Sequence, residues 1–411
     1  MVLSCLRSVR MVLAVFVCLL PWTLWAQSVA VEGNVGRALE VDPYIKVPRR
    51  DMGSVGVAWR WHSWAKDTAG YVRSYNYPTI AAGLMMTDFS RVRVKQPDFM
   101  PDAEPSRLGT SWVAFVEFDW PVVRPTRNTS VSFALRNGVG RSTRTWHREN
   151  NPENELIGSH WSVYFAAAFY GAWQTGRWTL RMGPEFHHLS NGALSRPNKG
   201  VNSVELGVSA AYCLTGERET VPADKGPLVP FDDKGLFLEF DWRTGLKTAL
   251  GEWLVDKKDQ AAGRPLTYGS YSLYVAYGLT AALMYRYDRR FASGVGLDFI
   301  HEPYLGRIEV QNPGRPRNVQ KQSWGISARH TFYYKRMQLR VAAGPYLSRP
   351  FSHWADTDEE FGFYERIGLN YNLPWLNRAL SVGYDIHAHK TKAYLTELSL
   401  SYRLPLGKRA R

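Results

Sequence analysis

The sequence predicts an all-β fold, a transmembrane antiparallel β-barrel of roughly 12 to 14 strands. Three observations support this prediction: an export signal, segments that alternate between apolar and polar residues, and an abundance of aromatic side chains. Of the 411 residues 45% are hydrophobic, and 16 Trp and 22 Tyr exceed what an ordinary soluble domain needs. After the signal no apolar run reaches the ~18 residues of a transmembrane helix candidate. The apolar surface is therefore expected on strands.

Residues 1–26 have the pattern of a secretory signal peptide. Arg7 and Arg10 precede an apolar stretch over residues 11–20, and small residues allow cleavage after Ala26 or as late as residue 30. The apolar run is shorter than the ~20 residues of a membrane anchor. We therefore expect residues 27–411 to form the mature protein, as one barrel domain.

Cysteine usage excludes a fold that depends on disulfides. Cys5 and Cys18 lie in the signal, so Cys213 has no partner within the mature chain. We interpret it as a small residue that faces other strands.

Alternation with a period of two is the main evidence for strands, because successive side chains of a strand point to opposite faces. In one segment Trp112, Val116 and Trp120 share a face that opposes Glu117 and Asp119. The same pattern places Leu236, Leu238, Phe240 and Trp242 opposite Glu239, Asp241 and Arg243, and Tyr394, Leu398, Leu400, Tyr402 and Leu404 opposite Glu397, Ser399, Ser401 and Arg403. Aromatic residues at the ends of such strands are typical of the girdles of an outer-membrane barrel.

Further strands are expected throughout the mature chain, separated by turn-rich, charged stretches. The remaining candidates are residues 55–62, 78–88, 129–141, 159–174, 178–190, 202–214, 269–285, 290–301, 322–348 as a pair, 359–372 and 378–388. The longest connections are expected at one rim, because barrels of this type place long loops outside and short turns on the periplasmic side. These connections are residues 91–109, 142–157, 215–233, 250–266 and 303–320. No second domain is expected.

The formal net charge of +14 favours an anionic partner. An exported barrel does not meet nucleic acid, so a membrane surface rich in phosphorylated glycolipid is the more natural partner. A simple excess of Lys and Arg in solvated loops explains the charge equally well. No Gly-x-Ser-x-Gly, His-Glu-x-x-His or Cys-x-x-Cys pattern occurs, so we expect no metal and no cofactor.

One hairpin combines polar residues on a face that should contact lipid. In the segment 178–190, Trp178, Leu180, Met182 and Phe186 share a face, and the same parity places His188 and Ser190 there. On the following strand the outward parity includes Asn202. Polar side chains on a lipid face cost free energy and call for a reason. A serine beside an imidazole that a third group orients is the arrangement of nucleophilic acyl transfer.

A structural reading of each residue remains open. His188 and Ser190 are alternatively a polar pair at a strand end, and Asn198 and Gly200 serve the turn in either case. The lumen-facing residues Glu185, His187 and Glu205 are expected to be structural rather than catalytic.

Residues 150–215 resemble the lipid A 3-O-deacylase (PagL-like, acyloxyacyl hydrolase) family. The resemblance rests on His188-Leu-Ser190-Asn191 with Arg196-Pro-Asn198-Lys-Gly200, and on the run Asn151-Pro-Glu-Asn-Glu-Leu-Ile-Gly-Ser-His160, which is similar to a stretch of longer family members. It implies hydrolysis of a 3-hydroxyacyl ester of lipid A in the outer membrane, with Ser190 as nucleophile and His188 as general base. It also implies an oxyanion site from Asn191 and a backbone N–H near Gly192 or Ala193. Where the best-known form has a Glu as third residue, this sequence has Asn202.

The alternative is a passive barrel, a pore or structural protein with a charged lumen. The outward parity of His188 and Ser190 separates the two, because a channel needs its polar residues inside. Since lipid A occupies the outer leaflet, the hairpin 191–200 should lie at the external rim, opposite both mature termini. Strand 178–190 must then be odd-numbered. A direct count makes it the sixth, so one earlier strand assignment is expected to be wrong.

Overall fold

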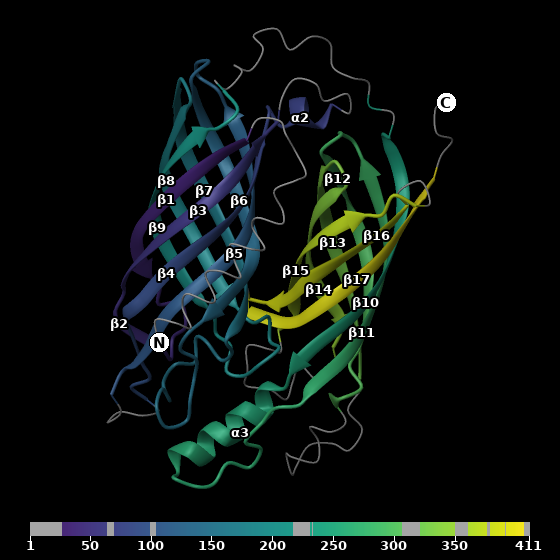
Figure 1. Ribbon diagram of the computed structural model, residues 1–411. Coiled ribbons are helices and arrows are strands. Elements are labelled where there is room, and N and C mark those ends of the chain that lie inside the picture. The colour runs from purple at the N-terminus through teal and green to yellow at the C-terminus, as the bar shows by residue number, and fades with distance from the viewer. Residues whose placement is uncertain are drawn as a thin grey trace.

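Two antiparallel β-barrels, joined in one chain, make up the protein (Figure 1). The computed structural model describes residues 27–63, 70–98, 104–216, 231, 233–305, 321–349, 361–375, 379–390 and 392–406. The expected signal peptide lies outside these residues.

The first barrel closes through eight strands, in the order β4-β3-β1-β9-β8-β7-β6-β5 and back to β4. A short strand, β2 (Lys46–Arg49), pairs with the end of β4, and the four-residue helix α2 (Tyr71–Ser74) lies between β3 and β4. The eight strands are β1 (Gln27–Ala38), β3 (Asp51–His62), β4 (Thr79–Lys95), β5 (Ser106–Val123), β6 (Thr129–Ser142), β7 (Trp161–Thr175), β8 (Trp178–Ser190) and β9 (Val201–Cys213).

The second barrel is a simple up-and-down ring in which each strand pairs with its neighbours in sequence and β10 pairs with β17. A twelve-residue helix, α3 (Leu250–Ala261), follows its first strand. Among the described residues no helix is long and apolar enough to cross a membrane. The strands are β10 (Gly235–Thr248), β11 (Leu273–Arg286), β12 (Phe291–His301), β13 (Gln322–Tyr334), β14 (Met337–Ser348), β15 (Phe363–Asn372), β16 (Leu380–His389) and β17 (Lys392–Pro405).

The expectation of a single barrel of roughly 12 to 14 strands is corrected by this topology, because two eight-stranded rings close separately. Alternation marks individual strands, but closure depends on the pairings β4–β5 and β10–β17, which local sequence does not encode. The missing early strand is β1, whose Val31 and Val35 point outward while Glu32 and Asn34 are buried. With β1 included, β8 is the seventh strand of its ring, an odd number as its expected direction requires.

Two of the segments that were expected to form external loops are arranged differently in the structure. The connection 215–233 joins the end of β9 to the start of β10, and both lie at the rim opposite Ser190. Within residues 250–266 the chain forms α3 instead of an irregular loop. The expected segment 303–320 lies mostly outside the described residues.

The alternating pattern correctly separates the outer face from the lumen in both barrels. Trp112 and Val116 are exposed whereas Glu117 and Asp119 are buried. Tyr394 is an exception: it lies in the lumen, where its hydroxyl donates to Glu302. Two consecutive residues at 394 and 395 are buried beside an irregularity in the β16–β17 pairing, and this irregularity reverses the parity.

Ion pairs fill the lumens. In the first barrel Arg136 pairs with Glu32 at 2.9 Å and Glu117 at 2.7 Å, and Arg181 pairs with the same two carboxylates. In the second barrel a comparable network joins Arg243, Arg329, Arg340 and Arg366 to Glu239, Asp241, Asp298 and Glu397. Each lumen is therefore a packed polar core, in which buried charges have partners.

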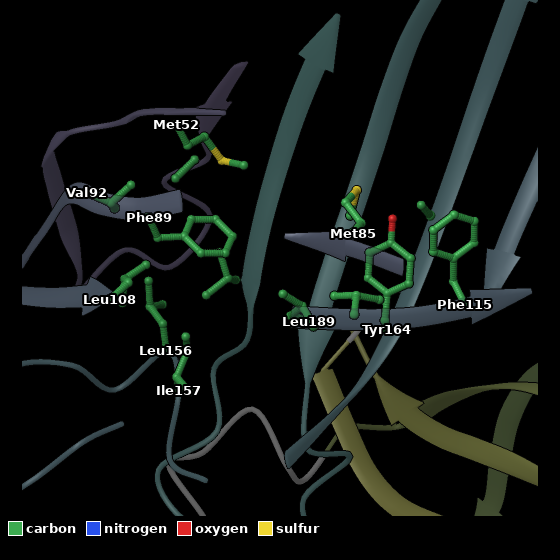
Figure 2. Close-up of a cluster of buried hydrophobic side chains, with 14 of the residues drawn as sticks. Met52, Met85, Phe89, Val92, Leu108, Phe115, Leu156, Ile157, Tyr164 and Leu189 are labelled. Atoms are coloured by element: carbon green, nitrogen blue, oxygen red, sulfur yellow. The ribbon is translucent and has the colours of Figure 1, made fainter. Parts of the chain in front are cut away.

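A cluster of buried apolar side chains inside the first barrel includes Leu189, next to the end of β8. Figure 2 shows Leu189 beside Tyr164, with Met85 and Phe115 nearby, whereas Leu156 and Ile157 lie in a neighbouring group of the same cluster. Leu189 points inward between His188 and Ser190. Its burial therefore holds the two polar neighbours on the outer face.

Candidate active site

The side chains of His188 and Asn202 meet on the outer face of the first barrel. The two residues are direct partners in the β8–β9 register, and His188 Nδ1 lies 2.8 Å from Asn202 Oδ1. Because an amide oxygen only accepts, this hydrogen bond assigns the proton to Nδ1 and leaves the Nε2 lone pair available as a base.

Ser190 lies two residues further along the same face, at the end of β8, and is only 8% exposed. Its hydroxyl oxygen accepts hydrogen bonds from the Gly192 N–H at 3.1 Å and from the Asn198 side-chain amide at 3.5 Å. Within the described part of the chain, Ser190 and His188 do not hydrogen-bond to each other. Catalytic hydrogen bonds are often long in unliganded enzymes and tighten with substrate.

Gly200 is the residue that lies against both side chains. Its φ of 73° is in the left-handed region, and a Cβ there would meet His188 Cε1 at 2.9 Å and Ser190 Cβ at 3.3 Å. The turn therefore needs glycine here for conformation and for space. The Pro-Asn-x-Gly pattern marked this turn in the sequence, but not this contact.

The tight turn after Ser190 carries two consecutive left-handed residues, Gly192 with φ 65° and Ala193 with φ 69°. The Asn191 side-chain amide donates to the Ser195 carbonyl at 3.1 Å, and the Asn191 backbone N–H donates to Asn198. Asn191 thus holds the turn together in this structure. Ala193 is fully buried, and among the residues that the structure describes its N–H donates to no acceptor. Buried N–H groups without a partner are rare, so this one is a candidate donor to a ligand.

The segment 151–158 supports the hairpin from the rim. Lys199 and Gly200 donate their backbone N–H groups to the Glu155 and Leu156 carbonyls, at 3.0 and 3.1 Å. A Cβ on Gly158 would lie 1.8 Å from the Pro197 carbonyl oxygen, so only glycine allows this approach. In the sequence this segment was identified only through its resemblance to longer family members. The structure shows that it contacts the hairpin that follows Ser190.

A buried carboxylate at the rim holds the hairpin electrostatically. Asp42 lies 3.0 Å from the ammonium group of Lys199 and 3.5 Å from that of Lys392. Burial alone would raise the pKa of Asp42, but Lys199, the Tyr44 N–H and Lys392 together hold this pKa below its ordinary value. The sequence did not indicate the contact between Asp42 and Lys199, because their proximity depends on the pairing of β1 with β9.

The second barrel stands beside this site. Asn137, Phe165, His188 and Asn202 occupy one row across β6, β7, β8 and β9. The Tyr384 hydroxyl of β16 donates to the side-chain oxygen of Asn137 in that row. Strands are ~4.8 Å apart, so β16 contacts the first barrel roughly 10 Å from His188.

The residues expected to be structural lie inside the lumen. Glu185 accepts hydrogen bonds from Asn34 and Tyr170, and His187 lies 2.9 Å from Glu185. Glu205 accepts from Ser54 and Ser203. None of them is on the face that carries Ser190. Cys213 is buried and has no disulfide. The part of the chain that the structure describes contains no group of His, Cys, Asp or Glu arranged to hold a metal ion.

These observations define a class of protein: an outer-membrane type of β-barrel with a serine, a histidine and an asparagine gathered on its outer face. Two family models match the chain. Residues 53–211 match the lipid A 3-O-deacylase (PagL) family, and residues 241–406 match the acyloxyacyl hydrolase C-terminal domain (PagL_C). The chain belongs to this PagL family, and each model covers most of one barrel.

Solved structures of outer-membrane proteins resemble the chain only distantly. The outer membrane enzyme PagL is 14% identical, with 44% of this chain and 97% of that chain covered and a TM-score of 0.27. The alcaligin receptor FauA of Bordetella pertussis is 10% identical, with 93% and 76% covered and a TM-score of 0.23. The NalP translocator domain of Neisseria meningitidis is also 10% identical, with 97% and 93% covered and a TM-score of 0.19. A search of curated proteins found no match.

Proposed function

We propose that this protein is an outer-membrane esterase that removes an ester-linked 3-hydroxyacyl chain from lipid A, with Ser190 as nucleophile. The observation that carries the proposal is the hydrogen bond between His188 and Asn202 on the outer face, beside Ser190. Membership of the lipid A 3-O-deacylase family supports the substrate and the location.

In the proposed reaction the Ser190 oxygen attacks the carbonyl carbon of the acyl ester, and His188 Nε2 takes the hydroxyl proton. The tetrahedral intermediate collapses as the lipid A alkoxide leaves, and His188 returns the proton to it. Water then attacks the acyl-enzyme with His188 as base, which releases the hydroxy fatty acid and restores Ser190. Substrate binding has to bring His188 and Ser190 within hydrogen-bonding distance.

Asn202 is assigned the orienting role. Its oxygen fixes the imidazole tautomer but brings no negative charge, so it supports the imidazolium less than a carboxylate would. The oxyanion is assigned to backbone N–H groups of the turn, at Gly192 and Ala193. Asn191 contributes by shaping the turn, because its side-chain amide already donates to Ser195.

A lipid substrate fits the surroundings of the site. On the same outer face, further from the rim that carries Ser190, the side chains are apolar and exposed. They include Phe169, Met182, Val204 and Leu206. An acyl chain entering laterally from the membrane would lie along this surface. The passive-pore alternative lacks such support, because the buried charges of both lumens form ion pairs.

The test measures release of hydroxy fatty acid from purified lipopolysaccharide in detergent by wild-type protein, Ser190→Ala and His188→Ala. We expect each substitution to lower the rate by several powers of ten, because both residues act in one catalytic unit.

The matched control is Ser293→Ala. Ser293 Oγ lies 2.8 Å from His330 Nδ1 on the outer face of the second barrel, so this variant also removes a hydroxyl from an outward Ser–His pair. It should keep wild-type activity. Heat-modifiable gel mobility verifies folding of every variant, and a folded Ser190→Ala that releases fatty acid at the wild-type rate excludes the proposal.

A further inference from the structure

We infer that the second barrel belongs to the active site: the Thr396 hydroxyl, from β17, is a positioning group that fixes the oxyanion peptide of the first barrel. This inference rests on the proposed function and deepens it. Its basis is a set of hydrogen bonds that cross between the two barrels at the turn after Ser190.

The central contact joins Thr396 to the peptide between Gly192 and Ala193. The Thr396 hydroxyl donates to the Gly192 carbonyl at 2.7 Å. A peptide unit is planar and trans, so its carbonyl and its N–H point in opposite directions. The hydrogen bond from Thr396 therefore also sets the direction of the Ala193 N–H, and aims it away from the second barrel.

That N–H has the properties of an oxyanion donor. Ala193 is fully buried, three residues after Ser190, and its N–H donates to no acceptor among the described residues. The neighbouring N–H, of Gly192, lies 3.1 Å from the Ser190 oxygen. A donor held in place before the reaction stabilises developing negative charge without reorganisation.

Thr248, also in the second barrel, holds the next peptide unit of the turn. The Thr248 N–H and hydroxyl both donate to the Ala193 carbonyl, at 2.8 and 3.0 Å. Arg196 of the turn donates back to the Thr248 carbonyl at 3.1 Å. Two consecutive carbonyls of the turn are thus bonded to strands of the other barrel.

The fit at this contact is close. A Cβ on Gly192 would lie 2.2 Å from the Thr396 hydroxyl and 3.3 Å from Ile386 Cδ1. Ala193 also holds a left-handed conformation, which is unfavourable for a non-glycine residue and persists only where the surroundings impose it. The hydrogen bonds from Thr396 and Thr248 supply that constraint.

The experiment compares kcat and KM on purified lipopolysaccharide for the wild-type protein, Thr396→Val, Thr396→Ser and Thr244→Val. Valine keeps the shape of threonine and removes the hydroxyl, and serine retains the hydroxyl. Thr244 is the matched control, since it lies on the outer face of β10 next to Leu398 of β17. We expect kcat of Thr396→Val to fall roughly tenfold to a hundredfold with KM little changed, because small misplacement of catalytic groups has effects of this size.

The remaining variants separate the possible outcomes. Thr396→Ser should recover most of the activity, and Thr244→Val should match wild type. A folded Thr396→Val with wild-type kcat overturns the inference, and so does a loss that raises KM alone or that serine fails to rescue. Ser190→Ala is measured in parallel: if it stays active, or the wild-type protein is inactive, the proposed function itself fails.

Discussion

The Ser190 hydroxyl is distinguished from other outward serines by the groups around it. Ser293 also lies beside a histidine, His330, and is even hydrogen-bonded to it. At Ser190, unlike at Ser293, an asparagine orients the histidine, and the tight turn carries a buried N–H that has no acceptor among the described residues, so the groups that acyl transfer needs are present together. A Ser–His pair alone is therefore weak evidence for catalysis.

Gly200→Ala tests how closely Gly200 packs against the His188 side chain. The added methyl group would lie 2.9 Å from His188 Cε1, in a left-handed conformation that disfavours alanine. We expect a loss of activity of at least tenfold from a barrel that still shows heat-modifiable mobility, measured as fatty acid release. Gly176→Ala controls for the conformation, since its φ is 50° and a Cβ there meets nothing within 4 Å. Equal activity of both variants would contradict the contact.

Asn202 allows the orienting role to be separated from charge. Asn202→Ala removes the hydrogen bond to His188 Nδ1 and should lower kcat, but by less than Ser190→Ala does. Asn202→Glu supplies a carboxylate that stabilises imidazolium and should raise kcat above that of the alanine variant. Steady-state kinetics on lipopolysaccharide checks this order. An alanine variant as active as wild type would remove Asn202 from the mechanism.

At the scale of elements, the hairpin 191–200 is held from three directions. The segment 151–158 bonds its backbone, Asp42 binds Lys199, and β17 and the end of β10 hold its turn. These contacts explain how a short connection at a barrel rim keeps a fixed shape. Among the partners of the hairpin, only the segment 151–158 had been identified in the sequence, as part of a motif.

Lys199→Met should loosen the hairpin in a pH-dependent way. The pKa of Asp42 is lowered in the folded protein, so its pairing stabilises the fold above the ordinary carboxyl pKa and is lost as pH falls through the lowered value. At pH 7 we expect faster hydrogen exchange of the Lys199 and Gly200 amides in the variant than in wild type. The difference should shrink below about pH 4. A gap that persists unchanged at pH 3 would contradict the role of the charge pair.

Sequence patterns predicted the strands well and their closure poorly. The outward parity of Trp112, Val116 and His188 and the inward parity of Glu185 and Glu205 followed from alternation alone. The inward position of Tyr394 was not predicted, because an irregularity at residues 394 and 395 reverses the parity of the strand. A strict alternating pattern does not reveal such an irregularity. Helix α3 was missed because its residues read as a charged loop; in the structure Trp253 packs on Trp146 of the first barrel.

At the scale of the whole molecule, the second barrel is the feature that the sequence did not predict. Closure into two rings depends on pairings between distant strands, and no local pattern marks where one ring ends. The contacts of Thr396, Thr248 and Lys392 with the first barrel arise from this arrangement alone. The candidate site was therefore foreseeable at Ser190, His188 and Asn202, and unforeseeable where the two barrels meet.

The most direct test of the central claim is mass spectrometry of lipid A from cells that express the wild-type protein or Ser190→Ala at equal levels in the outer membrane. The proposed reaction predicts that wild-type lipid A loses the mass of one 3-hydroxyacyl chain, while lipid A from the Ser190→Ala cells keeps it. Identical lipid A spectra from the two strains would contradict the proposal, whether both keep the chain or both lose it.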